Sequence, residues 1–212
     1  MIIMQTKIAI WGRDQFDLII YMARIILNCN KKILLVDWTS NKSLEAAIPT
    51  PSNLKSGVID YRGIDFVLKF DDEIINNYDV VLYSIDSYKD IVNECDQVIL
   101  VSDLFDFHIR DFNESKLSVN PILVVRDIIN YKIKGEYISN LLIPRIAAKC
   151  VYEIYEDSYD FKLKHDCYYD NVIKFTKLSK GFKEVLMSLV EIILTEQRTV
   201  IKSALKKAER GI

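Results

Sequence analysis

Glycine and proline are scarce in this sequence, because its 212 residues include only six glycines and four prolines. Propellers, collagen-like chains and turn-rich β-sandwiches depend on many more of both residues. Half of the residues are hydrophobic and 27% are charged, so the chain can bury a sizeable core. We therefore expect an ordered fold in which residues 1–212 form a single domain.

The spacings typical of metal sites and disulfide frameworks are absent from the sequence. The four cysteines are far apart, with no C-x-x-C pair, and the two histidines stand alone: Cys29, Cys95, Cys150, Cys167, His108 and His165. This pattern predicts no metal site and reduced thiols, as in a cytoplasmic protein. The sequence also has no run of about 18 apolar residues and no export signal, so we expect neither a membrane span nor secretion.

Positive charge is not in excess, because 28 Lys and Arg stand against 30 Asp and Glu. The protein therefore has no global positive field for nucleic acid. A local basic stripe does occur late in the chain, at Arg198, Lys202, Lys206 and Lys207. Acidic neighbours dilute it and no large aromatic anchor accompanies it, so we interpret it as a solvated helix face. A partner-protein helix, DNA contact and membrane contact remain alternatives.

Strand-length apolar runs alternate with stretches of helical periodicity along the chain. The runs are continuous rather than alternating, which is typical of parallel strands covered on both faces. They are Thr6–Trp11, Lys32–Asp37, Asp79–Ser84, Gln97–Ser102, Pro121–Arg126 and Lys149–Tyr155. Helices are expected over 14–30, 88–94, 104–112 and 131–142, and from an N-cap at Ser179 through about Arg210.

This alternation predicts an α/β fold: a doubly wound, mostly parallel sheet with helices on both faces and a long C-terminal helix. Such sheets bind ligands beyond the carboxyl ends of their strands. Here those ends form a rim that runs through Trp11–Gly12, Asp37, Ser84–Asp86, Ser102–Asp103 and Arg126–Asp127. We take this rim as the candidate functional site.

The order and spacing of several segments resemble those of the ParA/MinD-type ATPases, which are SIMIBI-class P-loop proteins. The resemblance covers nearly the whole chain and is carried by IAIWGRDQFDLIIYMARIILNCNKKILLVDWTSNKSLEAAI, NYDVVLYSIDSYKD, CDQVILVSDLFDFHIRDF, PILVVRDI and the closing segment that starts at IYEDSYD. It implies a P-loop NTPase-like fold with an ATP and magnesium site at the strand ends. Among such proteins, the TadZ/CpaE-type localisation factors of pilus systems also have atypical phosphate loops.

The phosphate loop departs from the pattern of that family. A working loop needs glycines, a lysine for the phosphates and a Ser or Thr for magnesium. Between Gly12 and Asn30 the sequence has one glycine and no lysine, serine or threonine. Counted from Asp37, the lysine of the family falls near Gln15 and its magnesium hydroxyl near Phe16.

Further departures surround that loop. Asp14 and Asp17 add negative charge, and a carboxylate about 4 Å from a phosphate costs on the order of 4 kcal/mol at an effective dielectric of about 20. Ser84 stands where the family has an acidic residue, and Arg126 remains where its base-contacting Asn-Arg would lie. The equivalents of a degenerate nucleotide site are Gly12, Arg13, Asp14, Gln15, Asp37, Ser84 and Arg126.

These features predict a catalytically inactive ParA/MinD-like protein without a cofactor, which acts as a scaffold, positioning or partner-docking subunit. The first alternative is an ATPase that binds ATP or ADP with magnesium through an atypical loop. The second alternative is an NAD(P)-binding Rossmann protein, in which Asp37 would bind a ribose, although G-x-G-x-x-G is absent. We expect Asp37 to cap the turn that follows it.

The same rim is expected to bind a protein partner, a second copy of the chain, or both. Trp11, Phe16 and Trp38 lie near it in the sequence, and aromatic residues are enriched at interface centres. Arg13 beside Asp14 offers both charge signs, as a two-fold contact requires. We expect Arg13 to pair with a carboxylate, with Asp14, Asp17 and Asp37 as candidates.

Overall fold

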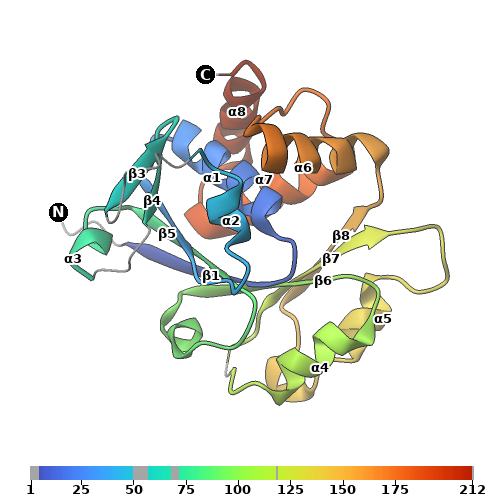
Figure 1. Ribbon diagram of the computed structural model, residues 1–212. Helices are drawn as coiled ribbons and strands as arrows, with labels where there is room; N and C mark the ends of the chain where they lie inside the picture. The colour runs from blue at the N-terminus through green and yellow to red at the C-terminus, as the bar shows by residue number, and fades with distance from the viewer. Residues whose placement is uncertain (1–4, 50–56, 68–71, 118, 212) are drawn as a thin grey trace.

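The fold is built on one eight-stranded sheet (Figure 1). The computed structural model describes residues 5–49, 57–67, 72–117 and 119–211. The strand order is β3-β4-β2-β5-β1-β6-β7-β8, and every neighbouring pair is parallel except β3 and β4. The strands are β1 (Thr6–Gly12), β2 (Ile33–Asp37), β3 (Val58–Tyr61), β4 (Ile64–Val67), β5 (Val80–Ile85), β6 (Gln97–Ser102), β7 (Ile122–Ile128) and β8 (Cys150–Tyr155). The predicted doubly wound, mostly parallel sheet is confirmed.

Helices cover both faces of the sheet (Figure 1). One face carries α1 (Phe16–Asn28), α7 (Lys180–Leu194) and α8 (Arg198–Glu209), and the other carries α4 (Asp106–Glu114) and α5 (Gly135–Asn140). The shorter helices are α2 (Ser43–Ala46), α3 (Asp72–Ile75) and two 3₁₀ helices, Asp90–Glu94 and Pro144–Ile146. The remaining helix, α6 (Ser158–Asp170), lies beside α7 near the carboxyl ends of the strands (Figure 1).

Successive residues of the central strand β1 enter different cores. Ile8 and Ile10 pack into the cluster under α1 and α7, whereas Ala9 and Trp11 pack into the cluster under α4. All four side chains are buried, because a strand presents alternate side chains to opposite faces of its sheet. This arrangement explains why the strands read as continuous apolar runs.

The β3–β4 hairpin and helix α6 were not predicted from the sequence. The antiparallel hairpin β3–β4 falls in a stretch without regular periodicity, because its strands have four residues each and several of its side chains are only half-buried. Helix α6 lies in the closing segment before Ser179, where the sequence predicted no helix, and it buries only Leu163 and Cys167. Its N-cap is Asp157, whose side chain accepts hydrogen bonds from the backbone N–H groups of Tyr159 and Asp160.

The predicted C-terminal helix needs one correction, because it is two helices rather than one. Ser179 caps its start as expected, but α7 ends at Leu194 and α8 begins at Arg198. Thr195 lies between them with a left-handed φ of 51°, which a continuous helix does not allow. The guanidinium of Arg198 donates to the carboxylates of Glu184 and Glu191 on α7, with N–O distances of 2.6 and 2.7 Å.

The remaining sequence expectations concern cysteines and membrane spans. The four cysteines are free thiols, as predicted. Within the described ranges, no helix has the length and apolar character needed to cross a bilayer.

Candidate functional site

The carboxyl ends of five neighbouring parallel strands meet at one edge of the sheet, as the sequence predicted. Strands β2, β5, β1, β6 and β7 run in the same direction, so their last residues form the rim. A cleft of about 450 Å³ lies there, which we call the rim cleft. It is lined by Gly12, Arg13, Asp14, Gln15, Thr39, Ser40, Asn41, Ser43, Asp86 and Ser87. Four of the seven predicted nucleotide-site equivalents therefore lie together.

Gly12 is required by the sheet itself. A Cβ atom at this position would lie 2.2 Å from the carbonyl oxygen of Val101 on the neighbouring strand β6. Such a distance is far inside van der Waals contact, so a larger residue would force β1 and β6 apart. The packing of two strands is thus sufficient to explain the single glycine of this loop.

Gln15 occupies the expected lysine position, and its side chain is turned into the protein. It is 1% exposed, and its Nε2 atom donates to the carbonyl oxygen of Ile85 at 3.0 Å and lies 3.4 Å from Oγ of Ser84. Ser84 is itself fully buried at the end of β5. These contacts tie the first turn of α1 to β5.

Arg126 forms a buried ion pair with Asp17 at the start of α1. Its Nη1 and Nη2 atoms lie 2.7 and 2.8 Å from the two carboxylate oxygens of Asp17. Burial acts to raise the pKa of Asp17, but the charge and hydrogen bonds of Arg126, together with smaller effects of Lys164 and Leu18, outweigh it and the pKa is lowered. Nη1 also donates to the carbonyl oxygen of Asp14 at 3.1 Å, so Arg126 fixes the loop. The sequence analysis named both residues but did not predict that they pair. A single carboxylate in the apolar sequence of α1, Asp17, indicates a buried counter-charge.

Asp37 caps the turn that follows β2, as expected. Its Oδ1 atom accepts from the backbone N–H and hydroxyl of Thr39, at 2.9 and 2.5 Å. Its Oδ2 atom accepts from the N–H groups of Leu44 and Glu45, both at 2.9 Å. Both oxygens are thus used by the backbone that leads into α2, which disfavours a role in ribose binding.

The prediction that Arg13 forms an ion pair with a nearby carboxylate is wrong. Arg13 is exposed, and its guanidinium carbon lies 5.8 Å from the ring centroid of Phe107, a cation–π geometry. No ion pair joins it to a carboxylate among the residues that the structure describes. The carboxylate of Asp17, one of its expected partners, is taken by Arg126.

The three aromatic residues expected at an interface need a correction as well. Trp11 is 2% exposed and packs edge-on against Phe112, with ring centroids 4.9 Å apart. Phe16 is 4% exposed, so it too lies in the core. Only Trp38 is half-buried, beside the ring of Tyr83. The aromatic side chains that are exposed on the flanking helices include Phe107 on α4 and Phe161 on α6, which the sequence analysis did not single out.

The basic stripe divides into two parts. Arg198 is engaged with the two glutamates of α7 and so holds α8 in place. Lys202, Lys206 and Lys207 are exposed along α8, and none of them lines the rim cleft. The exposure of these three lysines is consistent with the interpretation of the stripe as a solvated helix face.

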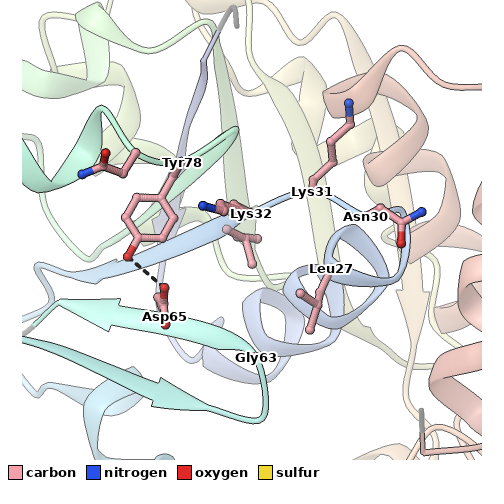
Figure 2. A pocket seen from close by; sticks show the side chains of 9 residues that line it. Leu27, Asn30, Lys31, Lys32, Gly63, Asp65 and Tyr78 are labelled. Atoms are coloured by element: carbon pink, nitrogen blue, oxygen red, sulfur yellow. Dashed lines mark hydrogen bonds between the residues drawn. The ribbon is translucent and has the colours of Figure 1, made fainter.

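A second hollow, of about 370 Å³, lies at the opposite end of the sheet (Figure 2). It is bordered by the end of α1 and by the β3–β4 turn, where Gly63 has a φ of 81° and packs near Leu27. The phenol of Tyr78 donates to Asp65 at 2.8 Å across its wall. None of the predicted site residues lines this hollow. In the described part of the chain, no group of three His, Cys, Asp or Glu side chains could hold a metal ion.

The sheet order, the helices on both faces and the cleft at the strand ends define the fold of P-loop NTPases of the ParA/MinD type. The chain is similar to the MinC:MinD cell division protein complex of Aquifex aeolicus, at 18% identity over 91% of this chain and 97% of that one, with a TM-score of 0.69. It is also similar to a putative plasmid partition protein of Borrelia burgdorferi B31 bound to AMPPNP, at 13% identity over 90% and 99%, with a TM-score of 0.59. A plasmid partition protein of Borrelia burgdorferi gives 12% identity, the same coverage and a TM-score of 0.53. No protein-family model and no curated protein sequence matches the chain.

Proposed function

We propose that this chain is a non-hydrolysing member of the ParA/MinD fold group that works as a positioning or partner-docking subunit. The observation that carries the proposal is the inward hydrogen bonding of Gln15 at the position of the phosphate-binding lysine. With Gln15 held by β5, the loop offers a triphosphate only Arg13 as a cation, next to the carboxylate of Asp14. The TadZ/CpaE-type localisation factors, which have atypical loops, are the matching functional class.

The residues of the rim cleft fit a magnesium-bound nucleotide poorly. Position 16, where a magnesium hydroxyl is expected, is the buried ring of Phe16. Asp37 is saturated by backbone and hydroxyl donors, and Asp86 adds a second carboxylate to the cleft. We therefore propose that the protein uses no nucleotide cofactor. A nucleotide-binding ATPase is the second candidate, since one structural neighbour is bound to AMPPNP and the rim cleft has room for a ligand.

The docking partner in this proposal is another protein in the cytoplasm. A structural neighbour is a complex of two different proteins, MinC and MinD, which is consistent with a protein partner. A homodimer through the rim is less favoured than the sequence suggested, because Trp11 and Phe16 are buried and supply no interface anchor. DNA or membrane contact through Lys202, Lys206 and Lys207 remains a lesser alternative, since α8 has no exposed large aromatic residue.

The test is nucleotide turnover and binding with the purified full chain. We expect no magnesium-dependent phosphate release from ATP and no thermal shift with ATP, ADP or NAD. A ligand present at about 100 times its dissociation constant adds about 2.7 kcal/mol, which would raise the melting temperature of a chain this size by roughly 5–10 °C. Magnesium-dependent turnover that is lost in Asp37→Asn protein would overturn the proposal, and a shift with NAD alone would favour the Rossmann alternative.

A further inference from the structure

Two arginines meet at the corner where the β3–β4 turn packs against α1. Nη1 of Arg24 on α1 donates to the backbone carbonyl oxygen of Arg62 in the turn, at a distance of 2.6 Å. Gly63 of the same turn lies against the side chain of Leu27 on α1 (Figure 2). These two contacts fix the turn relative to the helix.

The positive charge of this corner has no counter-charge. Neither Arg24 nor Arg62 forms an ion pair among the residues that the structure describes. Arg24 is half-buried, and burial lowers the pKa of its guanidinium. The charge of Arg62 lowers this pKa further, Tyr61 acts in the opposite direction, and no carboxylate is among the groups that shift it. A half-buried cation beside a second cation is costly, and an anion from outside the chain would remove that cost.

The turn itself does not explain the arginine at position 62. Tyr61 and Ile64 pair across a two-residue turn, in which Arg62 and Gly63 have φ values of 55° and 81°. Turns with two positive φ values favour asparagine before glycine, because larger side chains are strained there. Arg62 is exposed, and its guanidinium carbon lies 5.4 Å from the ring centroid of Tyr61. Its charge is therefore held at the surface, where a ligand can reach it.

One carboxylate belongs to the turn, that of Asp60. It is exposed and accepts from the backbone N–H of Gly63 at 3.1 Å. It forms no ion pair with either arginine, and it is not among the groups that shift the pKa of Arg24. Asp60 thus weakens the attraction of the corner for an anion without cancelling two guanidiniums.

We propose that Arg24 and Arg62 bind an oxyanion, a phosphate or carboxylate group, at the surface where the β3–β4 turn meets α1. Guanidinium groups carry planar N–H forks that match the oxygen atoms of both groups. One N–H of Arg24 donates to Arg62 in the structure, and its other donors serve the ligand. The site shares no residue with the rim cleft, so the inference is separate from the proposed docking function.

The experiment titrates inorganic phosphate into the isotope-labelled full chain and follows the Nε–Hε signals of its arginines by NMR. Sodium chloride at the same ionic strength is the reference, because it screens charges without offering an oxyanion. We expect saturable shifts at Arg24 and Arg62 with a dissociation constant in the millimolar range.

Three variants make the result decisive. Arg62→Asn removes one cation and suits the positive φ of the turn, so the fold is retained and phosphate should bind about fivefold more weakly or worse. Asp60→Asn keeps an oxygen that accepts from Gly63 but removes the negative charge, so phosphate should bind about twofold more tightly. The matched control Arg110→Asn, on α4 at the opposite face of the sheet, should leave the affinity unchanged.

Short peptides resolve where the oxyanion comes from. Three peptides that differ only in a central phosphoserine, glutamate or serine are titrated in the same way, beside inorganic phosphate and acetate. A phosphoserine or glutamate peptide that binds much more tightly than the free ion places the group on a partner protein. Equal affinities assign the site to a free oxyanion, and the serine peptide should not bind.

Several results would overturn the inference. They are shifts that do not saturate, shifts that chloride reproduces, or an affinity for phosphate that is unchanged in the Arg62→Asn protein. Saturable shifts in the loop Gly12–Gln15 instead would count against both this inference and the absence of a nucleotide cofactor. Magnesium-dependent ATP turnover together with phosphate binding at Arg62 would overturn only the proposed function.

Discussion

Asp17 and Arg126 form the buried ion pair that holds the rim together. Their ion pair is bidentate and almost fully buried, at 1% and 7% exposure. Arg126 comes from β7 and Asp17 from α1, so the pair ties the loop after β1 to the neighbouring half of the sheet. The same guanidinium lies 5.5 Å from the ring centroid of Phe182 on α7. One arginine therefore joins three elements at the rim.

We predict that Asp17→Asn costs about 3–5 kcal/mol in the free energy of unfolding, because it leaves Arg126 buried without a counter-charge. The pKa of Asp17 is lowered in the folded state, so the contribution of the pair is present above the ordinary value of 3.8. It is lost as the pH falls through the folded-state pKa, which lies lower. Urea denaturation at pH 7 and at decreasing acidic pH measures both effects.

The control for this prediction is the exposed pair Arg110–Asp106, with side chains that are 68% and 60% exposed. Arg110→Met should leave the free energy of unfolding unchanged, since water screens such pairs. If Asp17→Asn behaved like Arg110→Met, the structural role assigned to the buried pair would be wrong.

At the scale of the elements, the break between α7 and α8 is the feature that sequence periodicity could not reveal. Apolar residues at helical spacing continue on both sides of it, so the pattern alone predicts one helix. The break depends on a left-handed Thr195, and threonine gives no signal for that conformation. Glycine or asparagine at this place would have predicted a helix end.

We predict that Thr195→Gly stabilises the protein by about 1 kcal/mol, because a β-branched residue is strained at a φ of 51° and glycine is not. Guanidinium denaturation measures the change. Thr199→Gly, which alters an exposed position inside α8, serves as the control and should lower stability by about 0.5 kcal/mol. Equal destabilisation by both substitutions would show that Thr195 is not strained.

The strands and the rim were predictable for a common physical reason. Parallel strands that are buried on both faces must be apolar along their length, so each produces a recognisable run. Their carboxyl ends then meet at one edge, which placed Gly12, Arg13, Asp14 and Gln15 in one cleft. Helix α6 and strand β3 bury few side chains, and their sequences carry correspondingly little periodicity. Side-chain partners, such as Ile85 for Gln15, depend on distant residues that no local pattern names.

At the scale of the whole molecule, the burial of Trp11 and Phe16 changes the expected assembly. A stable dimer needs an interface with well-packed anchors, and the rim supplies only the half-buried Trp38 among the three residues first considered. The rings of Phe107 on α4 and of Phe161 and Tyr169 on α6 are exposed instead. Of the three residues first considered, Trp11 and Phe16 are therefore not available as anchors of a dimer contact.

We predict that the isolated chain sediments as a monomer of 24.7 kDa up to high micromolar concentration. Analytical ultracentrifugation over a concentration series makes the measurement. The double variant Arg13→Glu, Trp38→Ala is the matched sample, and it should sediment identically. A dimer in wild type that is lost in this variant would restore the homodimer as the preferred assembly.

The place of β1 in the strand order has a consequence for folding during synthesis on the ribosome. The first two strands to be synthesised never pair with each other, because β5 lies between them. Ile8 of β1 pairs with Leu82 and Gln97, so the centre of the sheet cannot close until almost half of the chain has left the ribosome. Until then β1 has neither of its native strand neighbours, and distant pairing of this kind slows folding. The nascent chain is therefore a natural client for chaperones during the synthesis of its first half.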